Sequence, residues 1–243
     1  MHDITPRGRR TTTDNRCSIG IAAIALGIGF NIPYAVLACL YDYPQILRRP
    51  ASEALHRFAE GGPSIVLAWY GFMFAALALI PVALWLAVTR ERIVQSPTLA
   101  IGAAIAGSLA GLAQAIGLAR WVFTIPALAA HADSLDTQRA FDLLNAYGGV
   151  AIGENIGQLL TAWFVAQLAM LQAREGAHWL PRLGGLTALS IALGTGEGVA
   201  IALGRNGSLF SIATITGFVA LSLWLIATGT MLVRHGRAER RPA

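Results

Sequence analysis

The chain has 243 residues, of which 55% are hydrophobic and only 13% are charged, and its mean hydropathy is +0.58. Soluble globular domains usually carry about 25% charged residues, so this composition excludes an ordinary soluble protein. The formal net charge is +5, and all 18 basic residues are arginine, a usage typical of GC-rich bacterial genomes. Because the apolar content is so high, we expect a membrane partner and no nucleic-acid partner.

Six apolar blocks are long enough, or nearly so, to cross a bilayer core, which takes about 20 helical residues. In chain order they cover residues 18–41, 63–88, 99–130, 147–171, 183–203 and 209–233. Little of the chain lies outside them. The sequence therefore predicts an all-α, polytopic membrane protein, with a single bundle of six transmembrane helices over residues 17–235 and the lipid bilayer as its main partner.

The segments outside the spans predict a disordered basic tail over residues 1–16, a second tail over 236–243 and a surface helix over about 49–60. In that helix Leu55, Phe58 and Ala59 share one face, while Glu53 and Arg57 lie on the other. Such a pattern is typical of a helix lying at the membrane surface. It would either cover the ends of the spans or form a lid over an external cavity.

The distribution of arginine predicts the orientation. The two terminal segments and the second and fourth connections together carry 12 of the 18 arginines, whereas the remaining connections, which we expect to be outside loops, carry five, including Arg48. Positively charged segments stay on the cytoplasmic side. We therefore expect both termini to be cytoplasmic, in the cytoplasmic (inner) membrane of a bacterium.

Three charged residues fall deep within the predicted spans: Arg120 in "GLARWVFTIP", Glu154 in "GVAIGENIGQLL" and Glu197 in "LGTGEGVA". The predicted topology puts all three in the outer half of the bilayer. We expect Arg120 and Glu154 to form the central ion pair of an outward-facing polar pocket. Glu197, which has glycine on both sides, would then be an unpaired carboxylate that is protonated, hydrated or able to bind a proton or cation.

Other polar and aromatic side chains lie at a similar depth or on the same helix faces, and they complete a candidate site for a small amphipathic or charged ligand. They are Asn31, Tyr34, Trp69, Tyr70, Trp121, Asn155 and Gln158. Glycines spaced four apart, at Gly107 and Gly111 and at Gly149, Gly153 and Gly157, allow helices to approach closely. A homodimer through such glycine-rich faces is a further prediction.

Four stretches of the chain, "ILRRPASEALHRFAEGGPSIVLAWYGFMFAALALIPVALWL", "GLARWVFTIPALA", "GVAIGENIGQLLTAWF" and "WLPRLGGL", together resemble a family of bacterial six-helix membrane proteins that is known only as a domain of unknown function. The resemblance implies a fold and a set of recurring polar residues, but not an activity. In that family the residue after the glutamate is often histidine. Here it is Asn155, which argues against a metal or haem site, and we expect no cofactor.

Three functions of these residues stay open at this point, beside a helper or partner-binding subunit on which the sequence says nothing. The buried polar residues would form a knot that fixes helix register, a binding or transport site, or the centre of an intramembrane enzyme acting on a lipid. The segments "IGFNIP" and "IGENIG" match at four of six positions, as an inverted repeat of a transporter would. No catalytic motif such as G-x-S-x-G, H-E-x-x-H or C-x-x-C occurs, so we assign no catalytic residue and favour a non-enzymatic function.

Overall fold

A computed structural model describes residues 7–238 of the chain, and no strand occurs among them. Six segments of this part are long and apolar enough to cross a membrane. They are Arg16–Tyr41, Ala51–Ala87, Pro97–Ala129, Leu135–Arg174, Leu180–Ala202 and Ser208–Ala238. The predicted all-α bundle with six spans is confirmed, and the chain is a multi-pass membrane protein.

Most of the spans are built from more than one helix. The first joins α1 (Arg7–Gly29) to α2 (Asn31–Tyr41), and the second is α3 (Ala51–Ala87). The third joins α5 (Pro97–Phe123) to α6 (Ile125–Ala129). The fourth runs through α7 (Leu135–Leu144), the π-helix η2 (Asn145–Ile156) and α8 (Gly157–Arg174). The fifth joins α9 (Leu180–Gly194) to α10 (Gly196–Ala202), and the sixth is α11 (Ser208–Ala238). Two short helices, η1 (Gln45–Arg48) and α4 (Arg90–Gln95), lie in connections.

The predicted tails fall only partly on described residues, since 1–6 and 239–243 lie outside them. Within the described part, α1 already begins at Arg7 and α11 continues to Ala238. The segment 7–16, which we expected to be disordered, is therefore helical. No glycine or proline between residues 9 and 19 interrupts the helix as it leaves the apolar block.

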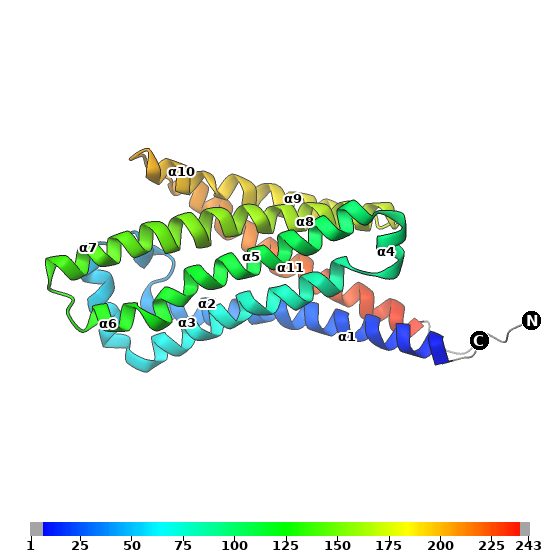
Figure 1. Ribbon diagram of the computed structural model, residues 1–243, viewed down its shortest axis with the longest axis horizontal. Helices are drawn as coiled ribbons and strands as arrows, with labels where there is room; N and C mark the ends of the chain where they lie inside the picture. Colours follow the sequence, from blue (N-terminus) through cyan, green and yellow to red (C-terminus); the bar gives the residue numbers. More distant parts are fainter. Residues whose placement is uncertain (1–6, 239–243) are drawn as a thin grey trace, which may run out of the picture.

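The spans form a closed ring in chain order. Helix α1 packs on α3, α3 on α5, α5 on α8, α8 on α9, α9 on α11, and α11 back on α1. In Figure 1 the beginning of α1, the end of α11 and the short helix α4 lie at one end of the molecule. The opposite end, which we call the distal end, carries α6, α7 and α10.

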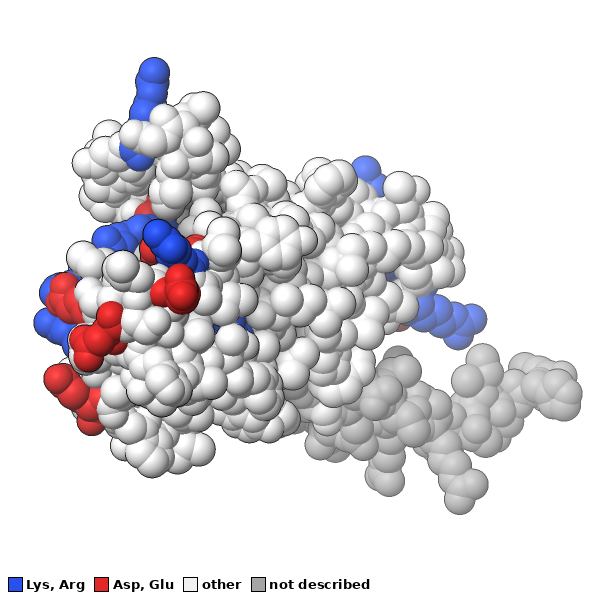
Figure 2. Space-filling model, turned by 60° about the vertical axis from the view of Figure 1, so that its left-hand side comes forward, with Lys and Arg blue, Asp and Glu red and all other residues white. Residues whose placement is uncertain are grey.

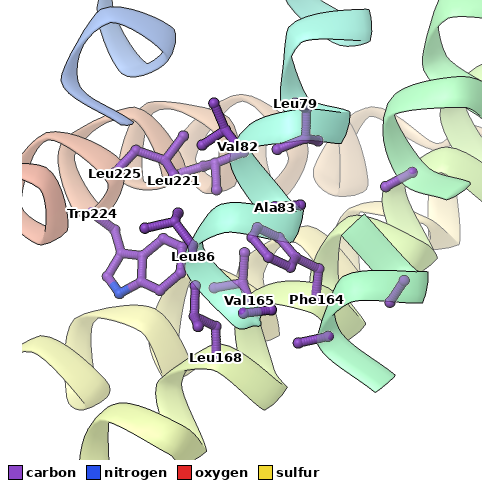
Figure 3. Packing of buried hydrophobic residues seen from close by; sticks show 14 of the residues in the cluster. Leu79, Val82, Ala83, Leu86, Phe164, Val165, Leu168, Leu221, Trp224 and Leu225 are labelled. Carbon is purple, nitrogen blue, oxygen red and sulfur yellow. The ribbon is translucent and has the colours of Figure 1, made fainter. Parts of the chain in front are cut away.

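Two large apolar clusters and a third of only three buried residues fill the ring. The larger one lies in the half nearer the termini, where side chains of α3, α8 and α11 interlock, among them Leu86, Leu168 and Trp224 (Figure 3). The second lies at the distal end and is dominated by aromatic side chains, including Tyr41, Phe58, Trp69 and Trp121. The polar residues singled out from the sequence lie near this distal cluster, so its packing positions them.

A sharp bend in α3 separates its first three turns from its membrane-spanning part. Gly62 has φ 54° and ψ −142°, a conformation that glycine adopts without the strain of a Cβ. The turns before it correspond to the predicted surface helix. Leu55 and Phe58 are buried in the distal cluster, but Ala54 completes that face and Ala59 is exposed. This segment therefore covers the distal ends of the spans.

Interruptions of the helices gather in the distal half of the ring. The first span breaks at Phe30, the third at Thr124 and the fifth at Thr195, while the fourth passes through η2. Pro33 and Pro126 follow the first two breaks within three residues. Because proline lacks an N–H group, it fits the first turn of a new helix without loss of a hydrogen bond, whereas Pro81 lies in the interior of α3.

The glycines that we expected at helix contacts pack against other helices of the same chain. A Cβ added to Gly107 would lie 2.5 Å from Ala83 Cβ, and one added to Gly111 would lie 2.7 Å from the Ala76 carbonyl oxygen. The glycines of the fourth span approach α5 in the same manner. Packing inside one chain thus accounts for the glycines that suggested a homodimer.

A close approach of two backbones joins α1 to α11 and so closes the ring. A Cβ added to Gly229 would lie 2.3 Å from the carbonyl oxygen of Gly20, and one added to Gly20 would lie 2.6 Å from that of Gly229. Glycines that face each other in this way allow the two backbones to pack directly.

We expect Gly229→Ala to lower the free energy of unfolding by about 1–3 kcal/mol, because the added methyl group forces the two backbones apart. Thermal unfolding of the purified protein in detergent measures this. The matched control is Gly185→Ala in α9, where an added Cβ meets nothing within 4 Å. Equal unfolding midpoints for the two variants would contradict the role given to Gly229.

Candidate functional site

The distal half of the ring surrounds a cavity of ≈ 180 Å³. Its walls come from α2, the first connection, α3, α5, η2, α8 and α11. Seven of the residues singled out from the sequence line it: Asn31, Tyr34, Trp69, Arg120, Trp121, Glu154 and Gln158. The cavity therefore joins residues from five of the six spans.

The other three candidates lie elsewhere. Tyr70 is 45% exposed on the outer surface of α3, because consecutive helical residues point about 100° apart and its neighbour Trp69 takes the inward position. Asn155 is not in the cavity wall and donates a hydrogen bond to the Thr195 carbonyl oxygen at 3.5 Å. Glu197 lies beside the cavity rather than in its wall.

Arg120 is the one charged side chain of α5 within its membrane-spanning part, and only 9% of it is exposed. Its guanidinium donates to the Gly117 carbonyl oxygen and to Asn145 Oδ1, the latter at 3.1 Å. It also lies over the ring of Trp121, with Cζ 5.1 Å from the ring centroid. The Nε atom of Arg120 is buried and has no protein hydrogen-bond partner. The charge is thus met by neutral groups, and one donor remains free.

The π-helix η2 makes room for this guanidinium. A π-helix is wider than an α-helix, and π-helical turns are frequent at functional sites. A Cβ added to Gly149 would lie 2.5 Å from Arg120 Nη2, so any other residue there would displace the charged group. Close by, a Cβ on Gly117 would lie 2.8 Å from Gly153 Cα. Small residues on both helices therefore let Arg120 lie flat against the backbone of η2.

Both glutamates bind Arg48 rather than Arg120. Arg48 Nη2 donates to Glu154 Oε2 at 2.6 Å, and Arg48 Nε donates to Glu197 Oε1 at 3.0 Å. Burial alone would lower the pKa of Arg48, but the two carboxylates outweigh it and hold the pKa above its ordinary value. Arg48 therefore stays charged and joins the fourth span to the fifth. We call these three residues the Arg48 bridge.

The predicted Arg120–Glu154 ion pair is wrong, and so is the expectation that Glu197 has no partner. Among the described residues no carboxylate lies within ion-pair distance of Arg120. The physical reason is the path of the first connection, which folds back into the distal end of the ring. It carries Arg48, which we had placed in an outside loop, between the two glutamates.

This connection covers the cavity. Tyr43, Pro44 and Leu47 line it from the distal side, and Asn145 Nδ2 donates to the Leu47 carbonyl oxygen at 3.3 Å. At its far end Arg49 forms ion pairs with Asp42 and Glu53. Figure 2 shows acidic and basic side chains gathered at the distal end, partly in a notch between a projecting lobe and the body of the molecule. The covering segment is thus the loop before the predicted surface helix, not that helix.

Aromatic rings form the wall on which Arg120 rests. Trp69 and Trp121 are stacked, with ring centroids 4.7 Å apart and an interplanar angle of 6°. Tyr43 packs edge-on against Trp69 at 5.3 Å and against Tyr34 at 5.3 Å. Burial, reinforced by Glu154, raises the pKa of Tyr43, so its hydroxyl stays protonated and able to donate. The buried Trp69 Nε1 also has no protein partner.

Sequence reasoning missed three residues of this region for different reasons. Arg48 is one of two adjacent arginines, and nothing in the sequence says which of them turns inward. Asn145 lies at the edge of an apolar block, and its polarity there was a usable signal. Gln114, which donates to Thr161 at 2.7 Å, is a polar residue within an apolar span and was equally visible.

Comparison with known proteins gives a family but no activity. A family model described as Domain of unknown function (DUF4386) matches residues 19–229. No curated protein and no solved structure matches the chain. The resemblance drawn from the sequence is therefore confirmed, and the site has to be interpreted from its own geometry.

The Arg48 bridge should contribute more to stability than any interaction between Arg120 and Glu154. We expect Arg48→Gln and Glu154→Gln to show a coupling free energy of about 1 kcal/mol in a double-mutant cycle. A second cycle with Arg120→Gln and Glu154→Gln should give a smaller coupling, because no hydrogen bond or ion pair joins these two side chains.

Both cycles are measured by thermal unfolding in the same detergent. A larger coupling in the Arg120 cycle than in the Arg48 cycle would restore the pairing predicted from the sequence.

Proposed function

The chain belongs to the family described as Domain of unknown function (DUF4386), and we propose that it binds a small amphipathic molecule in the distal cavity. We also propose that it lies in the cytoplasmic membrane of a bacterium with both termini in the cytoplasm. The excess of arginine in the terminal segments and the second and fourth connections taken together, 12 against five in the other connections, supports that orientation. The distal end is then external, and the cavity lies in the outer half of the bilayer.

The observation that carries the binding proposal is that Arg120 is buried and has no carboxylate within ion-pair distance among the described residues. A buried guanidinium with no carboxylate partner costs folding free energy, and protein sites retain such a cost where it serves binding or catalysis. Arg120 lines the cavity, and both its Nε and Trp69 Nε1 lack protein acceptors. A ligand that brings acceptor atoms to these donors would relieve the cost.

The cavity also has the composition of a ligand site. Apolar and aromatic walls with a few polar groups are typical of small-molecule pockets. Here Phe72, Leu118 and Phe218 provide apolar surface beside the two unpaired donors. An amphipathic ligand would match both parts of this lining.

A purely structural role explains the Arg48 bridge better than it explains Arg120. The bridge connects three segments of the chain through charged hydrogen bonds, which is how a polar contact fixes the arrangement of helices. Arg120 bonds only to its own helix and to Asn145. Its removal would therefore release few contacts between spans.

Transport is the second candidate, and the interrupted helices favour it. Breaks in spans one, three and five, together with η2, lie in the same half of the ring as the cavity, and discontinuous helices surround substrate sites in many transporters. A proton or cation at Glu197 would have to compete with Arg48, which already binds that carboxylate.

The test is ligand-dependent thermal stabilisation of the purified protein by anionic, cationic, zwitterionic and neutral amphiphiles of similar size. We expect at least one class to raise the unfolding midpoint, since ligand at 100 times its Kd adds about 2.7 kcal/mol of stability. Arg120→Gln should abolish this effect without lowering the midpoint of the ligand-free protein, because it removes a buried charge.

The matched control is Arg139→Gln, which changes a 77% exposed side chain at the same end of the molecule. It should leave the stabilisation intact. Two results would overturn the proposal: a ligand-free Arg120→Gln variant that unfolds, or stabilisation by the same amphiphiles that persists unchanged in it.

A further inference from the structure

The cavity is not closed on all sides, because the first span diverges from the last one. Helix α1 packs along α11, but beyond the break at Phe30 helix α2 packs on α3 instead. The bond from Asn31 Nδ2 to Ser222 Oγ, at 2.9 Å, joins α2 to α11 at the level where they begin to separate. We call the gap beyond this bond the α2–α11 seam.

Residues of the seam face both the cavity and the surroundings. Val219 lines the cavity from α11 and is 51% exposed. Asn31 and Tyr34 line it from α2, and Asn31 belongs to the exposed residues of that helix. Because both helices are membrane spans, the seam opens sideways toward lipid rather than toward either aqueous phase.

The size of the cavity limits what lies inside it. Its volume of ≈ 180 Å³ is smaller than that of pockets for drug-sized ligands, which measure about 300–1,000 Å³. A larger ligand would therefore keep only its polar head and its first few atoms in the cavity, and the rest would leave through the seam.

The hydrogen-bond donors of the cavity that have no acceptor indicate which polar head group the ligand carries. Arg120 and Trp69 each offer a buried donor without an acceptor, and Tyr43 offers a protonated hydroxyl. The nearby carboxylate of Glu154 is bound to Arg48. A guanidinium matches the two oxygens of a carboxylate in shape and charge. A carboxylate also has only three non-hydrogen atoms, which suits a small cavity.

From this geometry we infer that the ligand is a single-chain carboxylate, whose head binds Arg120 and Trp69 while its apolar chain passes through the α2–α11 seam into the outer half of the bilayer. The inference rests on the proposed function and names the class of molecule for the same site. The Arg48 bridge, with side chains that are 14–34% exposed, lies on the aqueous side and separates this head group from the external solution.

Binding of radiolabelled decanoate to the whole protein in phosphatidylcholine nanodiscs tests the inference. We expect saturable binding that is at least tenfold weaker in Arg120→Gln. Arg120→Lys should recover only part of the affinity, because lysine keeps the charge but not the planar pair of donors. Unlabelled decanamide, which has the same chain and no charge, should compete at least tenfold less well than decanoate.

The seam is tested with Val219→Trp, which should weaken decanoate binding at least fivefold by filling the opening. Pentanoate, which is short enough to lie mostly within the cavity, should bind this variant and the parent alike. Leu223→Trp is the matched control, because Leu223 is 57% exposed on the same helix and does not line the cavity. It should leave decanoate binding unchanged.

The outcomes separate the two proposals. Competition by decanamide equal to that of decanoate, or by a lysophosphatidylglycerol better than decanoate, would overturn the carboxylate assignment and leave the binding site in place. Decanoate binding that Val219→Trp does not affect would contradict the passage of the apolar chain through the α2–α11 seam. Stabilisation only by a cationic or zwitterionic amphiphile, in an Arg120-dependent manner, would overturn the inference but support the proposed function. If no class of amphiphile binds, both fail.

Discussion

The geometry of the distal site depends on one constraint, the placement of a guanidinium inside an apolar ring of helices. The charge of Arg120 needs polar contacts. These contacts are a carbonyl oxygen of its own helix, the amide oxygen of Asn145 and the ring face of Trp121. To bring Asn145 close, the fourth span has to widen into η2, and Gly149 has to lack a side chain. The cavity is what remains where these helices no longer follow regular α geometry.

The Arg48 bridge compensates the negative charges of two glutamates. Two carboxylates from neighbouring spans, Glu154 and Glu197, would repel each other if they were brought together alone, and Arg48 compensates both of them. The first connection is thereby held over the cavity from one side, while Arg49 holds it to Asp42 and Glu53 from the other. With Arg48 and Arg120 counted against Glu154 and Glu197, the buried region is neutral, although the two arginines have different surroundings. Arg48 has two carboxylate partners, whereas Arg120 has none and keeps a buried N–H without an acceptor.

The sequence predicted the architecture closely because hydropathy depends on local composition. The third span was expected at residues 99–130 and occupies Pro97–Ala129. The fourth begins earlier than expected, at Leu135 rather than near residue 147, because the more polar α7 continues the same helix beyond its apolar stretch. For the site, charges in apolar runs identified Arg120, Glu154 and Glu197, but not their partners. Which charge meets which depends on the fold of a loop that is distant in sequence, and neither hydropathy nor helical periodicity contains that information. The same holds for Tyr70, whose outward direction follows from the rotation of α3 about its own axis.

The contact between Gly20 and Gly229 has a consequence for how the protein is made. These glycines lie in the first and the last span, so the partner surface of α1 does not exist until α11 has been synthesised and inserted. Since chains emerge from their N-terminal side, α1 first packs on α3 and presents its glycine face to lipid while four further spans follow it. The ring, the seam and the cavity are therefore the last features to form. A nascent chain that stops before α11 would contain Arg120 and the Arg48 bridge without the wall that makes them a site.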